Sequence, residues 1–319
     1  MSDSRPRDSF VSPRFAQPAT FMRLPHRTDL TGVDVAIFGV PFDSGATYRS
    51  GTRLGPREIR AQSSLIRPYS HFQGISPFDV LTVVDAGDVD ASPLSVELAY
   101  GQIEAFVSGL AAASITPVAV GGDHGISLPI LRALAKRFGP LGLVQFDSHI
   151  DTWDTDFGCK LFHGSPFYYG LEEGHIDPTR FVQVGIRGPM YGANDFDYER
   201  AHGVTVIDIE EVRRLGVDAT IAAVRKVVGG GPAYVTFDID AVDPAFAPGT
   251  GTPEVGGLTS HEAQALVRGL TPLRLIGCDV VEVSPPFDGP GHITSLLAAN
   301  LLFELLCVIA KGRVESCSG

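Results

Sequence analysis

The sequence predicts an α/β protein, a three-layer α/β/α sandwich around a central, mostly parallel sheet of eight strands. Two observations lead to this class. Eight short runs rich in Val and Ile alternate with amphipathic segments along the chain, which is the element order of a layered α/β domain. Most of the runs are almost continuously hydrophobic, as expected for strands buried on both faces of a parallel sheet.

The expected elements follow one another without a long gap. Strands are predicted at residues 33–40, 80–84, 115–120, 141–146, 181–186, 204–209, 234–239 and 275–283, and helices at the amphipathic segments 96–113, 128–137, 218–228 and 260–270. The apolar stretch 295–310 is interrupted by Asn300 and Glu304 and is shorter than a membrane span, so it predicts a buried helix.

The competing architecture for this element order is an eight-stranded TIM barrel. It is disfavoured because polar motifs follow only some of the strands, and because the first strand-to-helix loop is long and rich in Gly. Residues 1–32 are polar and contain Pro, with an apolar island at 19–24, and predict an N-terminal arm packed on the outside or on a neighbouring subunit. Residues 33–319 contain no linker or repeat and predict a single catalytic domain.

Composition excludes several classes of function. Of 319 residues, 44% are hydrophobic and 19% are charged, which is typical of a globular protein with a large core. The 25 Lys and Arg against 37 Asp and Glu give a net charge of −12, which argues against binding to nucleic acid or to anionic membrane. The N-terminus has no apolar signal-peptide core, and the cysteines are too few for a disulfide scaffold. We therefore expect a cytoplasmic protein; the cysteines are Cys159, Cys278, Cys307 and Cys317.

Three polar motifs lie directly after expected strands. Gly121-Gly-Asp-His124 follows one run, Asp147-Ser-His-Ile-Asp151 follows the next, and Asp238-Ile-Asp240-Ala-Val-Asp243-Pro244 follows a third. Each motif alone could be a turn, a solvated loop or a helix cap. Because ligands in α/β sheets bind beyond the carboxyl ends of strands, three such motifs in equivalent positions favour a shared site.

The residue types in these motifs favour a pair of metal ions. Residues i and i+2 of an extended strand share a face, so alternate residues of each motif can converge. Several buried carboxylates repel one another unless cations neutralise them. Six ligands suit two ions that share carboxylates, and oxygen-rich ligation with one His per ion favours Mn²⁺ over Zn²⁺. The six are His124, Asp147, His149, Asp151, Asp238 and Asp240.

These motifs resemble the signatures of the ureohydrolases, the binuclear manganese family that includes arginase, agmatinase, guanidinobutyrase, guanidinopropionase and proclavaminate amidinohydrolase. The similarity covers roughly residues 15–312 and includes segments 49–57, 244–253 and 281–286. The opening residues 11–26 resemble the agmatinase and proclavaminate branch more than arginase. The resemblance implies an arginase-like fold and a homo-oligomer, a trimer or a hexamer.

The same resemblance assigns the metal ligands. It implies that His124 and Asp151 are terminal ligands of one Mn²⁺, and that His149 and Asp240 are terminal ligands of the other. Asp147 and Asp238 would bridge both ions. Ser148 departs from the family pattern, which usually has Ala there, and its hydroxyl could add a hydrogen bond behind the ligands.

The implied reaction is hydrolysis of a guanidino compound to urea and an amine. By resemblance, Glu282 pairs with the guanidinium, and His163 shuttles a proton to the leaving amine. A structural salt bridge is the alternative role for Glu282, and positioning near the metals is the alternative for His163. Asp243 precedes a proline in a turn and is expected to be structural, whereas the role of His292 stays open.

Substrate specificity is expected in the loop 152–158, which replaces the Asn-rich loop of arginases. Trp153 could line the mouth of the site or pack within the loop. Asp154 and Asp156 offer negative charge to a cationic tail, which favours agmatine, hydrolysed to putrescine and urea. A guanidino acid such as 4-guanidinobutyrate or 3-guanidinopropionate is the alternative substrate, with Lys160, Arg49 or Arg187 as its partner. A formiminoglutamase and a non-catalytic relative are less favoured.

Overall fold

A computed structural model describes residues 5–318 of the chain. It contains one open sheet of eight strands in the order β2-β1-β3-β8-β7-β4-β5-β6, and every neighbouring pair is parallel. The sheet has two edges, β2 and β6, and is therefore not a barrel. The strands are β1 (Val35–Val40), β2 (Val83–Asp88), β3 (Thr116–Gly121), β4 (Leu141–Phe146), β5 (Ile176–Val184), β6 (Thr205–Ile207), β7 (Ala233–Asp238) and β8 (Leu275–Val281).

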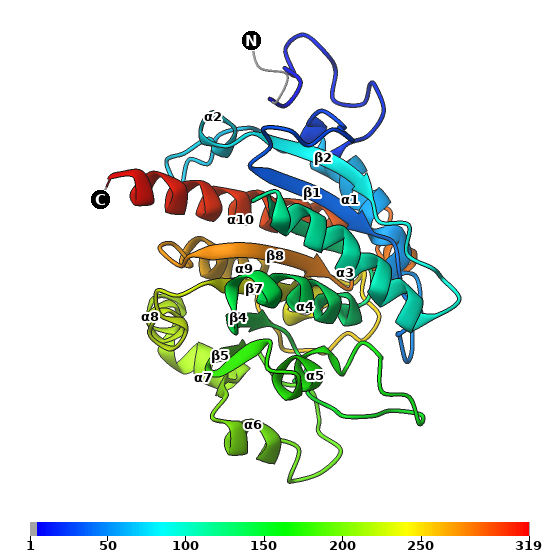
Figure 1. Cartoon of the computed structure of the whole chain (residues 1–319), viewed down its shortest axis with the longest axis vertical. Coiled ribbons are helices and arrows are strands. Elements are labelled where there is room, and N and C mark those ends of the chain that lie inside the picture. Colours follow the sequence, from blue (N-terminus) through cyan, green and yellow to red (C-terminus); the bar gives the residue numbers. More distant parts are fainter. Residues whose placement is uncertain (1–4, 319) are drawn as a thin grey trace.

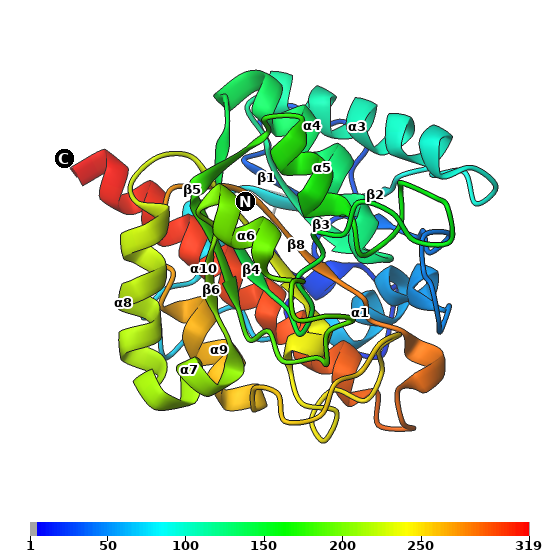
Figure 2. The same ribbon diagram turned by 90° about the horizontal axis from the view of Figure 1, so that it is seen from below.

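Helices cover both faces of the sheet, which confirms the predicted three-layer α/β/α architecture (Figures 1 and 2). One face packs against α3 (Val96–Ala112), α4 (Ser127–Phe138) and α5 (Pro166–Glu172). The short α6 (Asp197–His202) lies beside the edge strand β6. The other face packs against α1 (Gly55–Ser63), α2 (Pro77–Val80), α7 (Ile209–Leu215), α8 (Val217–Val228), α9 (Ser260–Arg268) and α10 (Ile293–Ser318).

The helix starts follow local capping chemistry. The Ser95 side chain accepts the N–H of Leu98 at the start of α3. At α9, Thr259 and Glu262 form a reciprocal capping box. Such caps satisfy N–H groups that have no partner inside the helix. They place the boundaries of α3 and α9 within a few residues of the predicted amphipathic segments.

Several strand boundaries differ from the predicted runs, and the largest shift is in β5, which begins at Ile176 and not at residue 181. The second strand was expected from residue 80, but Pro77 starts the short helix α2 and β2 begins at Val83. The sixth ends at Ile207, since Asp208 caps α7. The last ends at Val281, because Glu282 has a φ of 63° and leaves the sheet. Local signals from Pro, a capping Asp and a positive φ override the hydrophobic runs.

The predicted buried helix at residues 295–310 lies within α10. Among the described residues, the stretch Ile293–Glu315 contains an 18-residue window with a mean hydropathy of 2.1, so the helix is apolar and long enough to span a membrane by length and composition. However, 83% of that window is buried inside the protein, and the helix packs against α1, α9 and β8. Its apolar surface is therefore used within the fold.

The N-terminal arm is tied to its own domain by the apolar island. Phe21, Met22 and Leu24 are buried in the core. The Arg60 guanidinium lies 4.2 Å from the centre of the Phe21 ring and also pairs with Asp85 in β2. The island therefore packs inside this chain, while Phe10, Val11 and Phe15 further out on the arm are exposed.

Candidate metal centre and substrate pocket

The six candidate ligands meet at the carboxyl ends of β3, β4 and β7. These strands and β8 occupy the centre of the sheet in the order β3-β8-β7-β4. His124 begins a 3₁₀ turn after β3, and the segment from Asp147 to Asp151 follows β4. Asp238 is the last residue of β7. The structure thus brings all three sequence motifs to one edge of the sheet.

The convergence does not come from strand alternation, as the sequence analysis assumed. Asp147 and His149 lie in irregular backbone just beyond β4, and Asp151 adopts a positive φ of 52°. Asp240 lies in the 3₁₀ turn Ile239–Ala241. The side chains therefore converge because the chain turns sharply at each strand end. The i, i+2 expectation for an extended strand was wrong in its geometry, although it selected the residues that meet.

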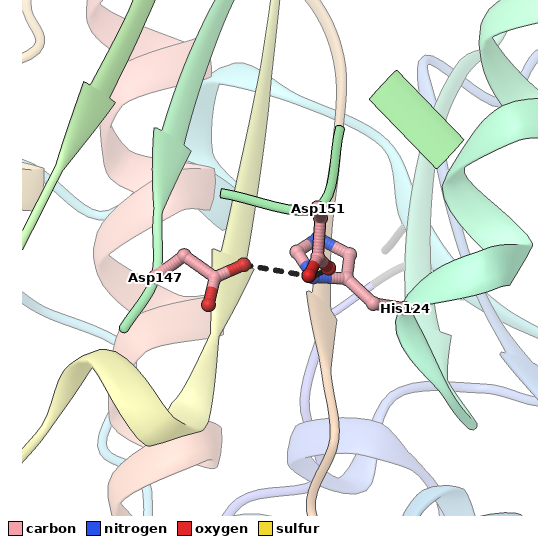
Figure 3. Close-up of side chains that lie close together, drawn as sticks. All are labelled: His124, Asp147 and Asp151. Carbon is pink, nitrogen blue, oxygen red and sulfur yellow. Dashed lines mark ion pairs between the residues drawn. The ribbon is translucent and has the colours of Figure 1, made fainter. Parts of the chain in front are cut away.

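His124 lies at the centre of the first group of ligands. Its Nδ1 atom is 2.9 Å from Asp151 Oδ2, 3.1 Å from Asp147 Oδ2 and 3.2 Å from Asp238 Oδ2. Figure 3 shows the side chains of His124, Asp147 and Asp151 pointing toward one another. All of these side chains are buried. This group offers one nitrogen and several oxygens to a single ion.

The second group shares Asp147 with the first. His149 Nδ1 lies 3.2 Å from Asp240 Oδ2 and 3.6 Å from Asp147 Oδ1. The two oxygens of Asp147 therefore face different histidines, which is the arrangement of a bridging carboxylate. Asp238 contacts the first group through Oδ2, while its Oδ1 accepts the N–H of Asp240 at 2.8 Å.

The charges of this cluster are strongly coupled. Burial alone lowers the pKa of His124, but the three carboxylates next to its Nδ1 raise it well above its ordinary value. Burial and the charges of Asp240 and Asp147 raise the pKa of Asp238 well above its usual range, and burial beside Asp147 raises that of Asp151 to about 6. Four carboxylates buried this close together repel one another, and bound cations would neutralise them. The buried Nδ1 of His124 has no hydrogen-bond partner in the described structure, so the donor set fits divalent ions.

A buried chain of polar groups holds His124 from behind. Its Nε2 lies 2.7 Å from the Thr236 hydroxyl, which donates to Asp279 Oδ1 at 2.5 Å. Asp279 Oδ2 also accepts hydrogen bonds from Ser127 and Tyr234, each at 2.7 Å. Such a chain fixes the ring orientation and leaves Nδ1 toward the ligands. The sequence analysis missed Thr236 and Asp279, although an Asp within the apolar run of β8 was a usable signal.

A cavity of about 350 Å³ opens over the cluster. Among the candidate ligands, His149, Asp151 and Asp238 line it. Its other lining residues are Thr47, Trp153, Thr155, Asp156, Phe162, His163, Gly164, Tyr191 and Thr252. The candidate metal centre is therefore the floor of a pocket large enough for a small molecule.

Glu282 and His163 lie together beside this cavity. His163 Nδ1 is 3.0 Å from Glu282 Oε1, and the same oxygen accepts the backbone N–H of His124 at 2.9 Å. Burial by itself lowers the pKa of His163, but the hydrogen bond and charge of Glu282 raise it to about 9. Glu282 is thus coupled to both His163 and the loop that carries His124.

Four residues were candidates for contact with the tail of the substrate beyond its guanidinium, and the structure places only two of them on the cavity wall. Trp153 and Asp156 line the cavity, and the Trp153 ring meets Tyr191 edge to face at 5.9 Å. Asp154 and Lys160 are exposed and are not among the lining residues. Four further lining residues were not predicted from the sequence: Phe162, which precedes His163, and Thr47, Tyr191 and Thr252, which come from other loops.

The two other candidate cations are held away from the cavity. Arg187 donates to the backbone carbonyls of Asp240, Ala241 and Glu254 at 2.6–3.1 Å. Its guanidinium therefore supports the loop that carries Asp240 and is not free for a substrate. Arg49 lies over the Phe287 ring at 4.9 Å and does not line the cavity. Of the three candidate partners for a carboxylate tail, Arg187 is therefore not available, because its donors are used by the backbone.

The expected structural role of Asp243 agrees with its contacts. Its side chain accepts the N–H groups of Ala245, Gly256 and Gly257 at 2.6–3.0 Å. These hydrogen bonds fix the turn after β7.

His292, whose role stayed open, lies 3.5 Å from Glu58, and its side chain is 38% exposed.

The fold and the acidic His/Asp cluster beneath a polar pocket define a hydrolase of the arginase-like α/β class. A sequence model of the arginase family matches residues 33–307. The chain is 51% identical to a guanidinopropionase of Pseudomonas aeruginosa over 313 residues, covering 98% of each chain. It is 50% identical to a guanidinobutyrase of the same organism, covering 93% of this chain and 94% of the relative.

A solved structure leads to the same family. The proclavaminate amidinohydrolase of Streptomyces clavuligerus superposes with a TM-score of 0.91 at 45% identity, covering 94% of this chain and 100% of that one. The chain belongs to the arginase family, in which binuclear metal centres carry the chemistry. It is therefore an amidinohydrolase that acts on guanidino compounds, and the predicted reaction class is confirmed.

Proposed function

We propose that this chain hydrolyses a short linear guanidino compound to urea and an amine, using two Mn²⁺ ions. The observation that carries the proposal is the position of two His/Asp groups, sharing Asp147, on the floor of a cavity beside Glu282 and His163. A small molecule in this cavity would therefore lie close to the metal ions, to the Glu282 carboxylate and to the His163 imidazole.

The six ligands support manganese. His124 and Asp151 would hold one ion, His149 and Asp240 the other, and Asp147 and Asp238 would be shared. Four carboxylates and two imidazoles form an oxygen-rich set that suits Mn²⁺. When bound, the two ions would supply Lewis acidity at the floor of the cavity.

The protein's own groups bind and protonate the substrate. Glu282 is buried beside the cavity. Its carboxylate would pair with the guanidinium of the substrate, which is a planar cation. His163 has a raised pKa and carries a proton at neutral pH, which suits a donor to the leaving amine. Trp153 and Phe162 provide apolar walls that exclude water from the guanidinium.

The charge of the cavity favours agmatine. Asp156 is an acidic side chain on the wall beyond the floor, and no Lys or Arg is among the described residues that line this cavity. A cationic tail would pair with Asp156, whereas a carboxylate tail would meet no opposite charge there.

A guanidino acid is the second candidate substrate, and the relatives favour it. The proteins that are 51% and 50% identical to this chain are named guanidinopropionase and guanidinobutyrase. With no Lys or Arg among the described lining residues, the carboxylate would be bound by hydroxyl donors such as Thr155 and Thr252. These hydroxyls would then exchange their present acceptors, the Cys159 carbonyl and Asp240 Oδ2, for the substrate.

The experiment is urea release by the Mn²⁺-loaded protein from agmatine, 4-guanidinobutyrate, 3-guanidinopropionate, arginine and guanidine. Preference for agmatine supports the role of Asp156 and a place in polyamine metabolism. Preference for a guanidino acid would support the same hydrolysis reaction, with the carboxylate tail bound by the hydroxyl donors and not by Asp156. No urea from any compound, with about two Mn²⁺ bound per chain, contradicts the proposal. Formamide release from formiminoglutamate would indicate a formiminoglutamase instead.

We also propose that the chain forms a homo-oligomer, a trimer or a hexamer. The support is the arm, on which Phe10, Val11 and Phe15 are 83–100% exposed. Exposed apolar side chains on this segment of turns and bends suit a protein contact. Light scattering of the purified protein tests this proposal, and a monomer would contradict it.

A further inference from the structure

Thr47 reaches the candidate catalytic histidine from a distant part of the chain. It lies in the loop between β1 and the 3₁₀ turn Thr52–Leu54, 116 residues away from His163 in sequence. Its hydroxyl is 2.7 Å from His163 Nε2, and the same nitrogen can accept the Thr47 backbone N–H at 3.3 Å only while the ring is neutral. Thr47 also lines the cavity above the metal ligands.

The contact is built into the fold by the neighbouring Gly45. Its N–H donates to Asp123 Oδ2 at 2.8 Å, and its carbonyl accepts the N–H of His163 at 3.0 Å. A Cβ atom at this position would lie 3.1 Å from Asp123 Oδ2 and 3.3 Å from the Cα of Phe162. The loop therefore packs tightly onto the segment that carries His163, and this packing holds Thr47 next to His163 Nε2.

The two ring nitrogens of His163 have different partners. Nδ1 faces the Glu282 carboxylate, which can only accept a hydrogen bond when ionised. Nδ1 therefore keeps its proton while Glu282 is charged, and proton exchange with the cavity falls to Nε2. The side-chain group that faces Nε2 is the Thr47 hydroxyl. A hydroxyl can accept one proton and donate another, so it can connect the ring to a molecule in the cavity.

We propose that the Thr47 hydroxyl is the proton relay between His163 and the leaving amine, an inference that rests on the proposed amidinohydrolase reaction. The Nε2–H bond of the imidazolium breaks as an O–H bond forms at Thr47. The original O–H bond of Thr47 breaks as an N–H bond forms on the amine nitrogen. Thr47 ends unchanged, His163 ends neutral, and water later returns a proton to the ring.

A merely structural role for Thr47 makes different predictions. Thr47→Val keeps the branched shape of the side chain and removes the hydroxyl, whereas Thr47→Ser keeps the hydroxyl and removes a methyl group. A relay needs the hydroxyl, so serine should restore the activity that valine loses. A packing role needs the methyl group, so serine should behave no better than valine.

The experiment compares these two variants with wild type and with Thr28→Val as matched control, since Thr28 is exposed in the segment between the apolar island and β1. We expect Thr47→Val to lower kcat by about 10- to 100-fold, because positioned general acids contribute about 100- to 10,000-fold. KM and metal content should stay within about twofold. Thr47→Ser should keep at least about a third of the wild-type kcat, and Thr28→Val should match wild type.

A second measurement does not depend on turnover. Nitrogen NMR of His163 in the metal-free protein should show a changed Nε2 signal in Thr47→Val and a wild-type signal in Thr47→Ser. An unchanged kcat in Thr47→Val, or equal losses in both variants, overturns the relay. If Thr47→Val does not fold, Thr47→Ala replaces it in the same comparison. If wild type itself releases no urea, the proposed function fails. The NMR result is separate: an Nε2 signal in Thr47→Val equal to that of wild type would overturn the contact between the hydroxyl and the ring.

Discussion

The Ser148 hydroxyl donates a hydrogen bond to Asp240 Oδ1 at 2.7 Å, and its oxygen lies 3.1 Å from His149 Nδ1. The backbone N–H of Ser148 reaches the same Asp240 oxygen at 3.1 Å. Ser148 is fully buried. A residue that departs from the usual family pattern therefore contacts both members of the second ligand group and leaves Asp240 Oδ2 toward His149.

Ser148→Ala should weaken binding of one Mn²⁺ and leave the other nearly unchanged. The lost hydrogen bond is to a charged group, worth about 1.5–3 kcal/mol at most. The remaining backbone N–H should limit the loss to roughly three- to tenfold in affinity. Calorimetric titration of the metal-free variant with Mn²⁺ measures both sites. Two affinities equal to those of wild type would show that the hydroxyl does not influence the second ion.

Asp147→Ala should abolish urea release, since it removes the carboxylate whose two oxygens face both histidines. It should also abolish stabilisation by metal. At 100 times the dissociation constant, a bound ion stabilises the fold by about 2.7 kcal/mol. We therefore expect Mn²⁺ to raise the melting temperature of wild type by several degrees, and that of Asp147→Ala by much less.

Asp243→Ala is the matched control for this comparison, because Asp243 binds backbone N–H groups and none of the candidate ligands. It should lower the melting temperature with and without Mn²⁺ while keeping the rise that Mn²⁺ produces. An equal Mn²⁺-induced rise in Asp147→Ala and wild type would refute the role of Asp147 in metal binding.

Much of the fold could be predicted because its signals are local and repeated. A strand buried on both faces needs apolar residues at every position, so β3, β4 and β7 follow their predicted runs closely. Predictions were less accurate at the edges of the sheet, where Pro77 begins a helix just before an apolar run and Asp208 caps a helix inside one. Hydrophobicity alone does not report where a helix cap ends a strand.

The candidate site could be predicted only where its residues lie in compact motifs. Asp147 and His149 are two positions apart and stand out beside an apolar run. Thr47 and Tyr191 come from single positions in separate loops, and their proximity to His163 or Trp153 depends on tertiary packing. Arg187 was kept as a candidate partner for a carboxylate tail because its sequence context does not reveal that backbone carbonyls surround its guanidinium.

Glu282→Gln should lower kcat/KM by at least about 100-fold while metal content stays near that of wild type. The amide keeps the shape of the side chain but loses the charge that pairs with a guanidinium, and charged hydrogen bonds are about twice as strong as neutral ones. Metal analysis beside urea release checks both parts. Loss of metal in this variant would instead make Glu282 part of the metal centre.

Asp156→Asn should lower kcat/KM for agmatine by about five- to tenfold, since removing one partly exposed ion pair costs about 1 kcal/mol. With a guanidino acid, the same variant should be equal to or faster than wild type, because the repulsion is removed. Asp154→Asn is the matched control, since Asp154 lies in the same loop but not on the cavity wall. Equal effects of the two variants would show that loop charge acts without contacting the tail.

The His163–Glu282 pair should make the stability of the metal-free protein depend on pH. Beside Glu282 the pKa of His163 is raised from 6.5 to about 9. The folded state therefore binds this proton more tightly than the unfolded state does. The resulting stabilisation is complete below about pH 6.5 and is lost as the pH rises through about 9. One pKa unit corresponds to about 1.4 kcal/mol, so the contribution is about 3 kcal/mol at most.

His163→Asn removes the titrating ring and isolates this effect. Urea unfolding of the metal-free proteins should give a free-energy difference between wild type and His163→Asn that is largest near pH 6 and smallest near pH 10. Comparing the two proteins at each pH cancels the titration of unrelated groups. His175→Asn serves as the control, because His175 contacts Glu173 outside the cavity. A wild-type advantage over His163→Asn that stays constant from pH 6 to pH 10 would mean that Glu282 does not hold a proton on His163.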